Sequence, residues 1–432
     1  MSEKTTFIAT GDSFITRRLP AGGYDGFEII KNIIESHDVR FNNLEVTAHE
    51  SEGYPAAFSG GTWAMANPGV LDDLKTYGFN IFNTANNHSC DYCHGGLLAT
   101  IRNLRERGML FAGTGATLYE ASAPCYLETK NARVALLGIC STIHSADAAG
   151  NQSIHMSGRP GLNPLRFNSY YCVKRDDFDM LNRIASNTCM NAQRLMAISN
   201  GYENPPAENE MEFGQLKFKC ADSYQTHTEP MKKDMERMTR MIEEAKRQAD
   251  YVLVSVHSHE FAGADRLIPA EFLVLFSHAC IDAGADAILG HGPHELRGVE
   301  LYKEKPIFYS LGNFIFQTET VELQPAEAYE NAGMPHDTLV GDYMNKRSNN
   351  GTKGYDVQKP IWDSVMASFT ASNGRIESIY FYPISLGMGV ARGRLGHPRL
   401  IKDDVVIQYL SELSKPFGTV INCSNGIGSI TL

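Results

Sequence analysis

Short strand-like runs alternate with helical segments along most of the chain, and this alternation limits the possible folds more than any other feature. The clearest run is Tyr251-Val-Leu-Val-Ser-Val256, which precedes a helical segment over 270–283 and a second run over 287–289. Strands joined by crossover helices pair in parallel and are covered by helices. The sequence therefore predicts an α/β protein whose sheets contain parallel strands.

The same alternation is found on both sides of this unit. The other expected strands lie at 5–10, 39–45 and 79–84, and the other expected helices at 24–36, 68–77, 95–107, 231–249 and 403–415. Hairpins are expected at 125–139 and 299–310. Two more are expected around Asn373-Gly374 and Asn425-Gly426, because Asn-Gly is the strongest short hairpin signal.

Two stretches interrupt the pattern. Residues 141–227 are rich in Asn, Ser and Gly, with a helix expected over 174–198, and residues 318–360 are polar and irregular. A chain of 432 residues can bury one large core or form two domains. We predict a single domain over 1–432, with a core of about 5–140, 228–317 and 361–432, an insertion at 141–227 and a second insertion or flap at 318–360.

Composition narrows the possible partners. The formal net charge of −11 argues against nucleic acid as the main partner. No signal peptide is visible, and no apolar run reaches the roughly 18 residues that a membrane span needs. Nine scattered cysteines suit a reducing compartment. We expect a cytoplasmic protein without a membrane span; a homodimer is compatible with the sequence.

Two histidines three positions apart follow a strand in Ala287-Ile-Leu-Gly-His-Gly-Pro-His294. Alone they would be ordinary loop histidines. Other strand-like runs, however, also end in polar groups that bind metals, namely Asp12, Glu45, Asn87, His88 and His257. Ligands collect at the carboxyl ends of strands in α/β sheets. Carboxylate, amide and imidazole donors together suit one or two divalent ions, Mn²⁺ first, with Fe²⁺ or Zn²⁺ as alternatives.

Five motifs carry a specific resemblance. Thr10-Gly-Asp12, Asn43-Leu-Glu45, Asn86-Asn-His88, Gly290-His-Gly-Pro-His294 and Pro306-Ile-Phe-Tyr-Ser-Leu-Gly-Asn-Phe314 resemble those of the CapA-type bacterial capsule or poly-γ-glutamate synthesis family. That family is similar to the calcineurin-like metallophosphoesterases. The resemblance implies a four-layer α/β/β/α sandwich of two mixed sheets, carrying the two insertions.

The resemblance also implies a role for each strand-end residue. Asp12 and His294 would bind the first metal, and Glu45 would bridge two metals. The second metal would be bound by Asn87, His257 and His291. His88 would not be a ligand and would protonate the leaving oxygen, because a metal-bound nitrogen has no proton to give.

Two positions depart from the phosphoesterase pattern. Phe14 stands where a second metal-binding histidine is usual, and Ser89 follows His88 where an acid is usual. Asp91 could orient His88 instead. The absence of a histidine at position 14 leaves both one and two metals open.

Four further residues are candidates for binding substrate. Arg159 and Arg166 bracket a Gly/Pro-rich loop and could bind a phosphate or a carboxylate, or be structural. Glu260 could face substrate, lie behind a ligand or be an ordinary loop acid. Asn313 could bind a ligand or only shape its turn.

Cys90-Asp-Tyr-Cys-His94 has the spacing of c-type haem attachment. Haem attachment needs export, for which no signal is visible, and the motif lies inside the Asn-Asn-His loop. We interpret Cys90 and Cys93 as free thiols, with a zinc or redox role as the alternative.

The expected activity is hydrolysis of a phosphate ester, in which metal-bound hydroxide attacks and His88 assists the leaving group. The partner would be a small-molecule phosphate ester or an anionic polymer. Two alternatives stay open. One is a non-catalytic accessory role in poly-γ-glutamate or capsule synthesis, and the other is hydrolysis of a γ-glutamyl amide.

Overall fold

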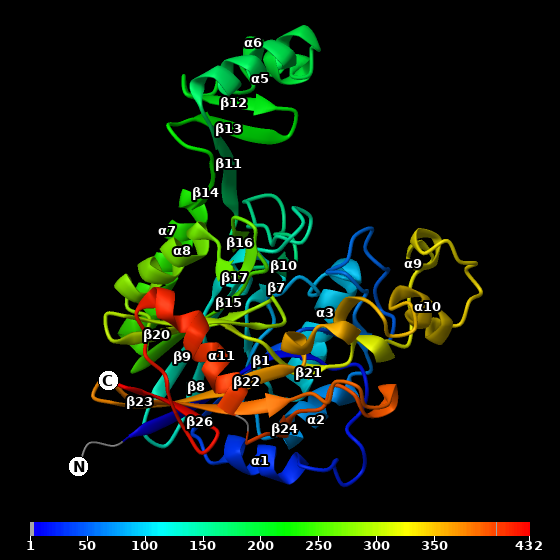
Figure 1. Ribbon diagram of the computed structural model, residues 1–432, viewed down its shortest axis with the longest axis vertical. Coiled ribbons are helices and arrows are strands. Elements are labelled where there is room, and N and C mark those ends of the chain that lie inside the picture. Colours follow the sequence, from blue (N-terminus) through cyan, green and yellow to red (C-terminus); the bar gives the residue numbers. More distant parts are fainter. Residues whose placement is uncertain (1–3, 403) are drawn as a thin grey trace.

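The alternation of strands and helices builds two large mixed sheets in the computed structural model, which describes residues 4–402 and 404–432 (Figure 1). The larger has ten strands, eight of them in the order β25 (Asn422–Ser424), β26 (Ile427–Thr431), β23 (Arg375–Ser385), β22 (Asp363–Ser372), β1 (Thr5–Phe14), β2 (Val39–Leu44), β5 (Ile81–Asn83) and β6 (Leu110–Ala112). β21 (Asn313–Phe316) pairs with β1, and β24 (Arg399–Leu400) pairs with β23. The strands from β1 to β6 run parallel, as the crossover helices predict.

The second sheet has six strands, in the order β19 (Leu296–Tyr302), β20 (Lys305–Leu311), β18 (Ala287–His291), β15 (Tyr251–His257), β9 (Arg133–Cys140) and β8 (Cys125–Glu128). Its four central strands are parallel, and the hairpins expected at 125–139 and 299–310 close its two edges. The prediction of a mixed α/β protein is therefore confirmed.

Three apolar clusters hold these layers together. One draws buried residues from both sheets, including Phe7 and Phe41 from the larger sheet and Leu253 and Phe308 from the smaller. A second joins the larger sheet to α1 (Phe27–Glu35) and α2 (Gly69–Thr76). A third joins the smaller sheet to α7 (Lys232–Gln248) and α8 (Glu271–Asp282).

The two Asn-Gly hairpins form as expected. Asn373 and Gly374 have φ of 51° and 74°, and Asn425 and Gly426 have φ of 54° and 76°. Two consecutive left-handed residues match the twist of antiparallel strands, which favours Asn-Gly. The remaining elements are β3 (Thr47–Ala48), β4 (Met65–Ala66), α3 (Cys93–Glu106), β7 (Thr114–Gly115), α4 (Leu118–Ser122), β10 (Gly161–Leu162), β16 (Phe261–Ala262), β17 (Asp265–Pro269), η4 (Arg392–Arg394), α11 (Asp404–Ser414) and η5 (Lys415–Phe417).

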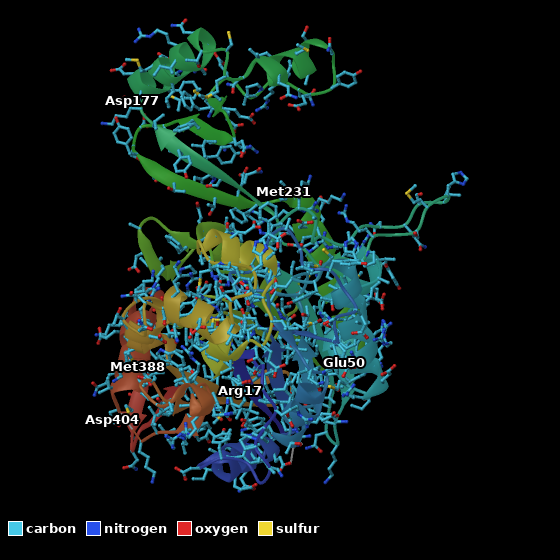
Figure 2. The ribbon with its side chains drawn as sticks, turned by 90° about the vertical axis from the view of Figure 1, so that its right-hand side faces the viewer. Arg17, Glu50, Asp177, Met231, Met388 and Asp404 are labelled. Carbon is cyan, nitrogen blue, oxygen red and sulfur yellow. The ribbon has the colours of Figure 1, made fainter. Side chains whose placement is uncertain are left out.

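Most of the stretch 141–227 forms a small unit that projects from the body (Figure 1). It contains β11 (Phe167–Val173), α5 (Arg175–Asn187), α6 (Ala192–Ser199), β12 (Glu210–Phe213), β13 (Leu216–Cys220) and β14 (Gln225–Pro230). The single helix expected over 174–198 is interrupted at Cys189, whose φ of 53° turns the chain out of the helix. Figure 2 shows Asp177 toward the outer end and Met231 where the unit joins the body.

The stretch 318–360 is more regular than expected. It contains η1 (Thr318–Thr320), α9 (Ala326–Asn331), α10 (Val340–Arg347), η2 (Gly354–Val357) and η3 (Lys359–Ile361). Tyr329, Tyr343 and Met344 are buried in the same cluster as Trp362. These few apolar anchors lie among polar residues, so the sequence shows no clear periodicity.

No helix within residues 4–402 and 404–432 is long and apolar enough to cross a membrane.

Phe7 tests the packing between the two sheets. Its ring stacks on Phe369 at 4.7 Å and meets Tyr251 of the other sheet edge-on at 5.4 Å. We expect Phe7→Ala to lower the free energy of unfolding by about 3–5 kcal/mol, because it leaves a cavity between the sheets. Urea unfolding followed by circular dichroism measures the change. Tyr380→Ala is the control, since Tyr380 is 43% exposed on β23; equal losses in the two variants would contradict this packing.

Candidate metal centre

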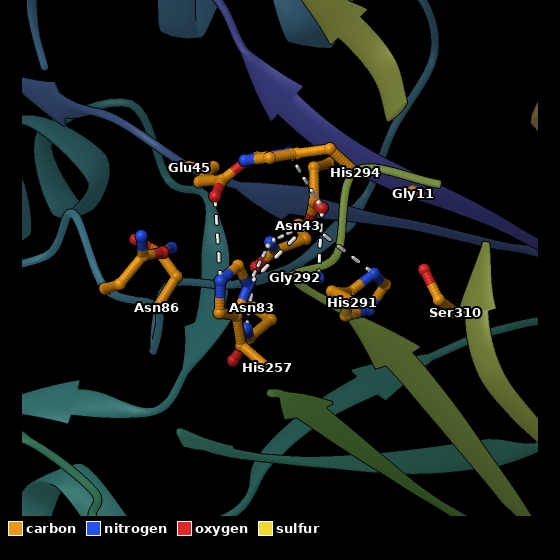
Figure 3. Close-up of polar contacts among 12 residues, drawn as sticks. Gly11, Asn43, Glu45, Asn83, Asn86, His257, His291, Gly292, His294 and Ser310 are labelled. Atoms are coloured by element: carbon orange, nitrogen blue, oxygen red, sulfur yellow. Dashed lines mark hydrogen bonds and ion pairs between the residues drawn. The ribbon is translucent and has the colours of Figure 1, made fainter. Parts of the chain in front are cut away.

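Strand ends from both sheets meet at one point. Asp12 lies near the end of β1, and Glu45 follows β2 directly. His257 and His291 end β15 and β18 and lie opposite each other in register. Figure 3 shows the side chains of Glu45, His257, His291 and His294 turned toward a common centre. The motifs that suggested the site are therefore brought together by the fold.

The distances within the cluster are short. His257 Nδ1 lies 3.7 Å from Asp12 Oδ1, and His257 Nε2 lies 3.6 Å from Glu45 Oε1. His294 Nδ1 lies 3.7 Å from Asp12 Oδ2 and 3.8 Å from Glu45 Oε2. His291 Nδ1 lies 3.8 Å from Asp12 Oδ1. Asp12, Glu45, His257 and His291 are fully buried.

Asp12 is held by hydrogen bonds from two directions. Asn43 Nδ2 donates to Asp12 Oδ1 at 2.7 Å, and Asn83 Nδ2 in turn donates to Asn43 Oδ1 at 2.7 Å. The backbone N–H of Gly292 donates to Asp12 Oδ2 at 3.1 Å. The carboxylate therefore keeps one orientation toward the histidines.

Gly292 is required for this arrangement. Its φ is 119°, and a Cβ at this position would lie 2.9 Å from the backbone of Ser258. Only glycine adopts this conformation without strain and leaves room for the neighbouring strand. The turn aims the Gly292 N–H at Asp12 and is followed by His294, itself at φ 60°.

Burial sets the protonation of the cluster. Burial raises the pKa of Asp12 to about 7, and it raises the pKa of Glu45 well above its usual value, helped by the charge of Asp12. Burial lowers the pKa of His291 to about 3 and that of His294 to about 4, and it holds the pKa of His257 well below normal. Neutral imidazoles are the form that binds metals.

Several buried atoms in the cluster have no hydrogen-bond partner in the described residues. They are both carboxylate oxygens of Glu45, Asn87 Oδ1 and both ring nitrogens of His291. An unsatisfied buried polar atom is costly. A divalent cation beside Glu45 would satisfy its carboxylate oxygens and offset the repulsion between Glu45 and Asp12, so the donor set fits a metal.

Among the residues that the structure describes, two groups of donors are close enough to hold an ion. Asp12, Glu45 and His294 form one, and Glu45, His257 and His259 form the other, with ligand atoms within 4.8 Å of one another in each group. The two groups share Glu45. His259 completes the second group, and its Nε2 lies 3.2 Å from His257 Nε2.

His88 is held by an acid three residues away. His88 Nδ1 lies 2.6 Å from Asp91 Oδ2, and the backbone amides of Gly60 and Ala64 donate to Asp91 at 3.1 and 2.7 Å. Asn87 Nδ2 donates to Gly60 O at 3.1 Å. Loop 59–64 therefore fixes both the Asp91–His88 pair and the Asn87 amide.

Phe14 packs against His88. Their rings meet edge-on with centroids 5.1 Å apart, and Phe14 is 2% exposed. The aromatic ring of Phe14 thus fills the space beside His88, and it offers no metal donor.

The side chains of Asn313 and Glu260 form hydrogen bonds with other residues of the protein. Asn313 Oδ1 lies 3.0 Å from His294 Nδ1, while its Nδ2 donates to the carbonyls of His294 and Ile361. Glu260 accepts hydrogen bonds from three hydroxyl groups, those of Ser141, Thr142 and Ser258. Both side chains are engaged behind the cluster, which favours the positioning interpretation for each.

The two arginines of the Gly/Pro loop differ from each other. Arg166 forms a two-pronged pair with Asp234, at 2.8 Å from Nε and 2.7 Å from Nη2. Arg159 is exposed and donates from Nε to Ala148 O at 2.9 Å. It lines a cavity of about 420 Å³ together with Phe58, Cys90 and Cys93. These two thiols are free.

Sequence reasoning missed three residues of the cluster. His259 lies two positions beyond His257, a spacing that places both on one side of an extended chain, and this signal could have found it. Asn43 stands inside the Asn-Leu-Glu motif and Asn83 ends its strand. Their function is to hold Asp12 in place, which no pattern reveals before the strands are paired.

Comparison with known proteins identifies relatives. Residues 6–318 match the model of a family described as bacterial capsule synthesis protein PGA_cap. An uncharacterized protein of Sinorhizobium fredii, y4sH, is 31% identical over 449 residues, which cover 99% of this chain and 93% of that protein.

Two further relatives are more distant. The PGA biosynthesis protein CapA of Bacillus subtilis is 24% identical over 291 residues, 67% of this chain and 56% of that protein. The capsule biosynthesis protein CapA of Bacillus anthracis is 24% identical over 323 residues, 73% of this chain and 60% of that protein. These findings confirm the resemblance that the five motifs indicated.

The protonation of Asp12 predicts how metal affinity depends on pH. Below its pKa of about 7 an incoming ion must displace the proton of Asp12, and Glu45, whose pKa is also raised, adds to the same pH dependence, whereas His291 and His294 are already neutral. We expect the apparent Mn²⁺ affinity to fall as the pH falls below about 7, roughly tenfold per pH unit for one displaced proton. Titration followed by electron paramagnetic resonance measures this. Asp12→Asn should bind more weakly with a shallower slope; an affinity independent of pH would contradict the prediction.

Proposed function

The chain belongs to the bacterial capsule synthesis family PGA_cap, and we propose that it is a metal-dependent hydrolase of the phosphoesterase type. The observation that carries this proposal is the pair of donor groups that share Glu45, in which every residue except the half-buried His259 is buried. A shared carboxylate between two imidazole-containing groups is the arrangement that places two divalent ions side by side.

We propose in addition that the fold is a four-layer α/β/β/α sandwich of the metallophosphoesterase type. The apolar cluster common to both sheets supports the two inner layers, and the clusters with α1, α2, α7 and α8 support the outer ones. We treat residues 1–432 as one domain. The stretches 141–227 and 318–360 are then insertions into it.

The proposed ligands are those that the family resemblance implies, and the two donor groups support Asp12, Glu45, His257 and His294 among them. Asp12 and His294 would hold one ion, Glu45 would bridge, and His257 with Asn87 and His291 would hold the other. His259 joins this second set on the strength of its position. The unpartnered atoms of Glu45, Asn87 and His291 support the assignment. Since Phe14 offers no donor, the metal position at Asp12 and His294 has fewer ligands. A single ion bound at the position of His257 is therefore the alternative to two ions.

A bound divalent ion would supply Lewis acidity and would lower the pKa of a coordinated water. The donor set contains no thiolate, so Mn²⁺ is the first choice, with Fe²⁺ and Zn²⁺ next. The protein contributes neutral imidazoles and two carboxylates whose charge an ion would balance.

The proton for the leaving group would come from His88. Asp91 accepts a hydrogen bond from His88 Nδ1 and so fixes the ring, and the doubly protonated imidazolium would give its second proton, on Nε2, to the leaving oxygen. Phe14 and loop 59–64 keep the ring in place. His88 is absent from both donor groups, which is consistent with a role as an acid.

A second function is supported by the names of the relatives. Proteins of Bacillus subtilis and Bacillus anthracis with 24% identity are described as PGA and capsule biosynthesis proteins. Together with Phe14, this favours an accessory role in polymer synthesis in which the chain binds an anionic polymer without turnover. Hydrolysis of a γ-glutamyl amide by the same centre is the remaining alternative.

Replacement of His88 tests the catalytic proposal. We expect purified protein with added Mn²⁺ to hydrolyse an aryl phosphate, and His88→Asn to lower kcat by about 10²- to 10⁴-fold without loss of Mn²⁺, because a general acid is removed and no ligand. The His291→Ala variant should lose both hydrolysis and Mn²⁺ binding. His336→Asn is the control, since His336 is exposed and pairs with Glu330. Protein that binds no metal and shows no turnover would rule out this function.

The accessory role makes the opposite prediction for polymer binding. If the chain only binds an anionic polymer, its affinity for poly-γ-glutamate should be the same in the wild-type protein and in His291→Ala, because the metal would not take part. Sedimentation of protein with labelled polymer measures this affinity. Binding that is absent, or that disappears with the metal ligands, would contradict an accessory role independent of metal.

A further inference from the structure

The stretch 318–360 contributes a small pocket that the metal centre does not explain. The pocket has a volume of about 160 Å³ and is lined by Arg347, Lys353, Tyr355, Ser348, Gly354, Glu319 and Asp356. This volume suits one carboxylate or phosphate group and is too small for a whole drug-sized ligand.

Arg347 is only partly used by the protein. It is half-buried at the end of α10, and its Nη1 donates to the hydroxyls of Thr62 and, at 3.5 Å, Thr318. Within residues 4–402 and 404–432 it has no ion-pair partner, and no hydrogen bond is formed by its Nε or Nη2. Its neighbour in the fold, Arg392, is paired with Glu319 at 3.4 Å. Arg347 therefore presents an unpaired fork of donors, the geometry that binds carboxylate or phosphate.

The pocket lies beside the metal centre. Thr62, which accepts from Arg347, lies in the loop whose amides hold Asp91. On the other side, the ring of Tyr355 meets that of His294 with centroids 5.9 Å apart and that of Phe316 at 5.2 Å. Tyr355 therefore separates the proposed ligands from the Arg347 pocket.

The charged residues that line the pocket are Arg347 and Lys353 on one side of the balance and Glu319 and Asp356 on the other. Glu319 is paired with Arg392, which lies outside the pocket. Of the two cations, Arg347 is half-buried and Lys353 is exposed. A half-buried cation with one free face attracts an anion more strongly than a solvated surface lysine does.

We propose that this pocket binds a second anionic group of the substrate, with Arg347 as the main contact and Tyr355 beside it. The inference rests on the proposed function, in which the first anionic group, the phosphate, binds at Asp12, Glu45 and the histidines. The substrate class is then a phosphate ester that carries a further carboxylate or phosphate on its non-reacting part. Arg347 and Tyr355 thereby determine specificity, and they are not catalytic.

Phosphonates test the proposal because they resist hydrolysis. Calorimetry on the Mn²⁺-loaded full-length protein compares simple alkylphosphonates with ω-carboxyalkylphosphonates of two, three and four carbons. We expect the added carboxylate to strengthen binding about tenfold at the best length, because it forms a charge-assisted, two-pronged bond with Arg347. Arg347→Gln should abolish this preference while alkylphosphonate affinity stays the same, and Arg347→Lys should retain part of it.

Lys346→Gln is the matched control. Lys346 precedes Arg347 in α10 and is exposed, and its Nζ donates to the carbonyl of Gly333 at 3.3 Å. The Lys346→Gln substitution removes one positive charge from the same helix as Arg347→Gln does. The preference for the carboxylate-bearing phosphonates should be retained in this control. The proposal is overturned if the wild-type protein shows no preference at any length. It is also overturned if Arg347→Gln weakens both ligand types equally, because Arg347 would then act only through the loop of Thr62.

Failure of the hydrolase proposal is recognised separately. Electron paramagnetic resonance reports Mn²⁺ binding in the same samples, and a protein without bound Mn²⁺ would refute the metal-dependent function. The carboxylate series is titrated with and without metal. If the preference for the added carboxylate depends on Arg347 but not on metal, the anion-binding pocket is supported independently of the hydrolase proposal. If no such preference is seen with or without metal, the pocket proposal is refuted.

Discussion

Two carboxylates, Asp12 and Glu45, are buried side by side in a cluster of histidines. Burial and mutual repulsion both oppose their ionisation, and Glu45 has no hydrogen-bond donor among the described residues to compensate. A buried charge without a partner is costly, because the protein interior replaces the water that would solvate it. The cluster is therefore stable either with bound protons or with a cation in their place. The proposed chemistry follows from the replacement of these protons by a cation.

The fold keeps this costly cluster assembled through its backbone. Gly11 and Gly312 approach so closely that a Cβ on Gly11 would lie 1.9 Å from the carbonyl oxygen of Gly312, which ties β1 to the chain that carries Asn313. Gly292 aims its N–H at Asp12, and Asn313 holds His294. Because these contacts join segments from both sheets, the donors are positioned before any ligand arrives, as rigid metal sites require.

The two insertions contribute in different ways. The unit between β11 and β14 projects from the body and builds its own small apolar cluster around Phe178 and Met211. The stretch 318–360 packs into the main core through Tyr343 and Met344, and it brings Tyr355 against His294. A segment attached in this way can tune which molecules reach a centre whose donors come from the shared core. This is the physical basis for assigning specificity to Arg347 and reactivity to the strand ends.

The sequence by itself determined the mixed α/β class, the two Asn-Gly hairpins and the strand ends at Asp12, Glu45, His257 and His291, because apolar periodicity and turn chemistry are local properties. It also indicated Asp91 as the partner of His88, since the two residues are three positions apart. Only the tertiary structure decided that Asn43 and Asn83 hold Asp12, that Arg166 is engaged by Asp234, and that Tyr355 lies against His294. These contacts join residues tens to hundreds of positions apart, and no local pattern encodes which strand lies beside which.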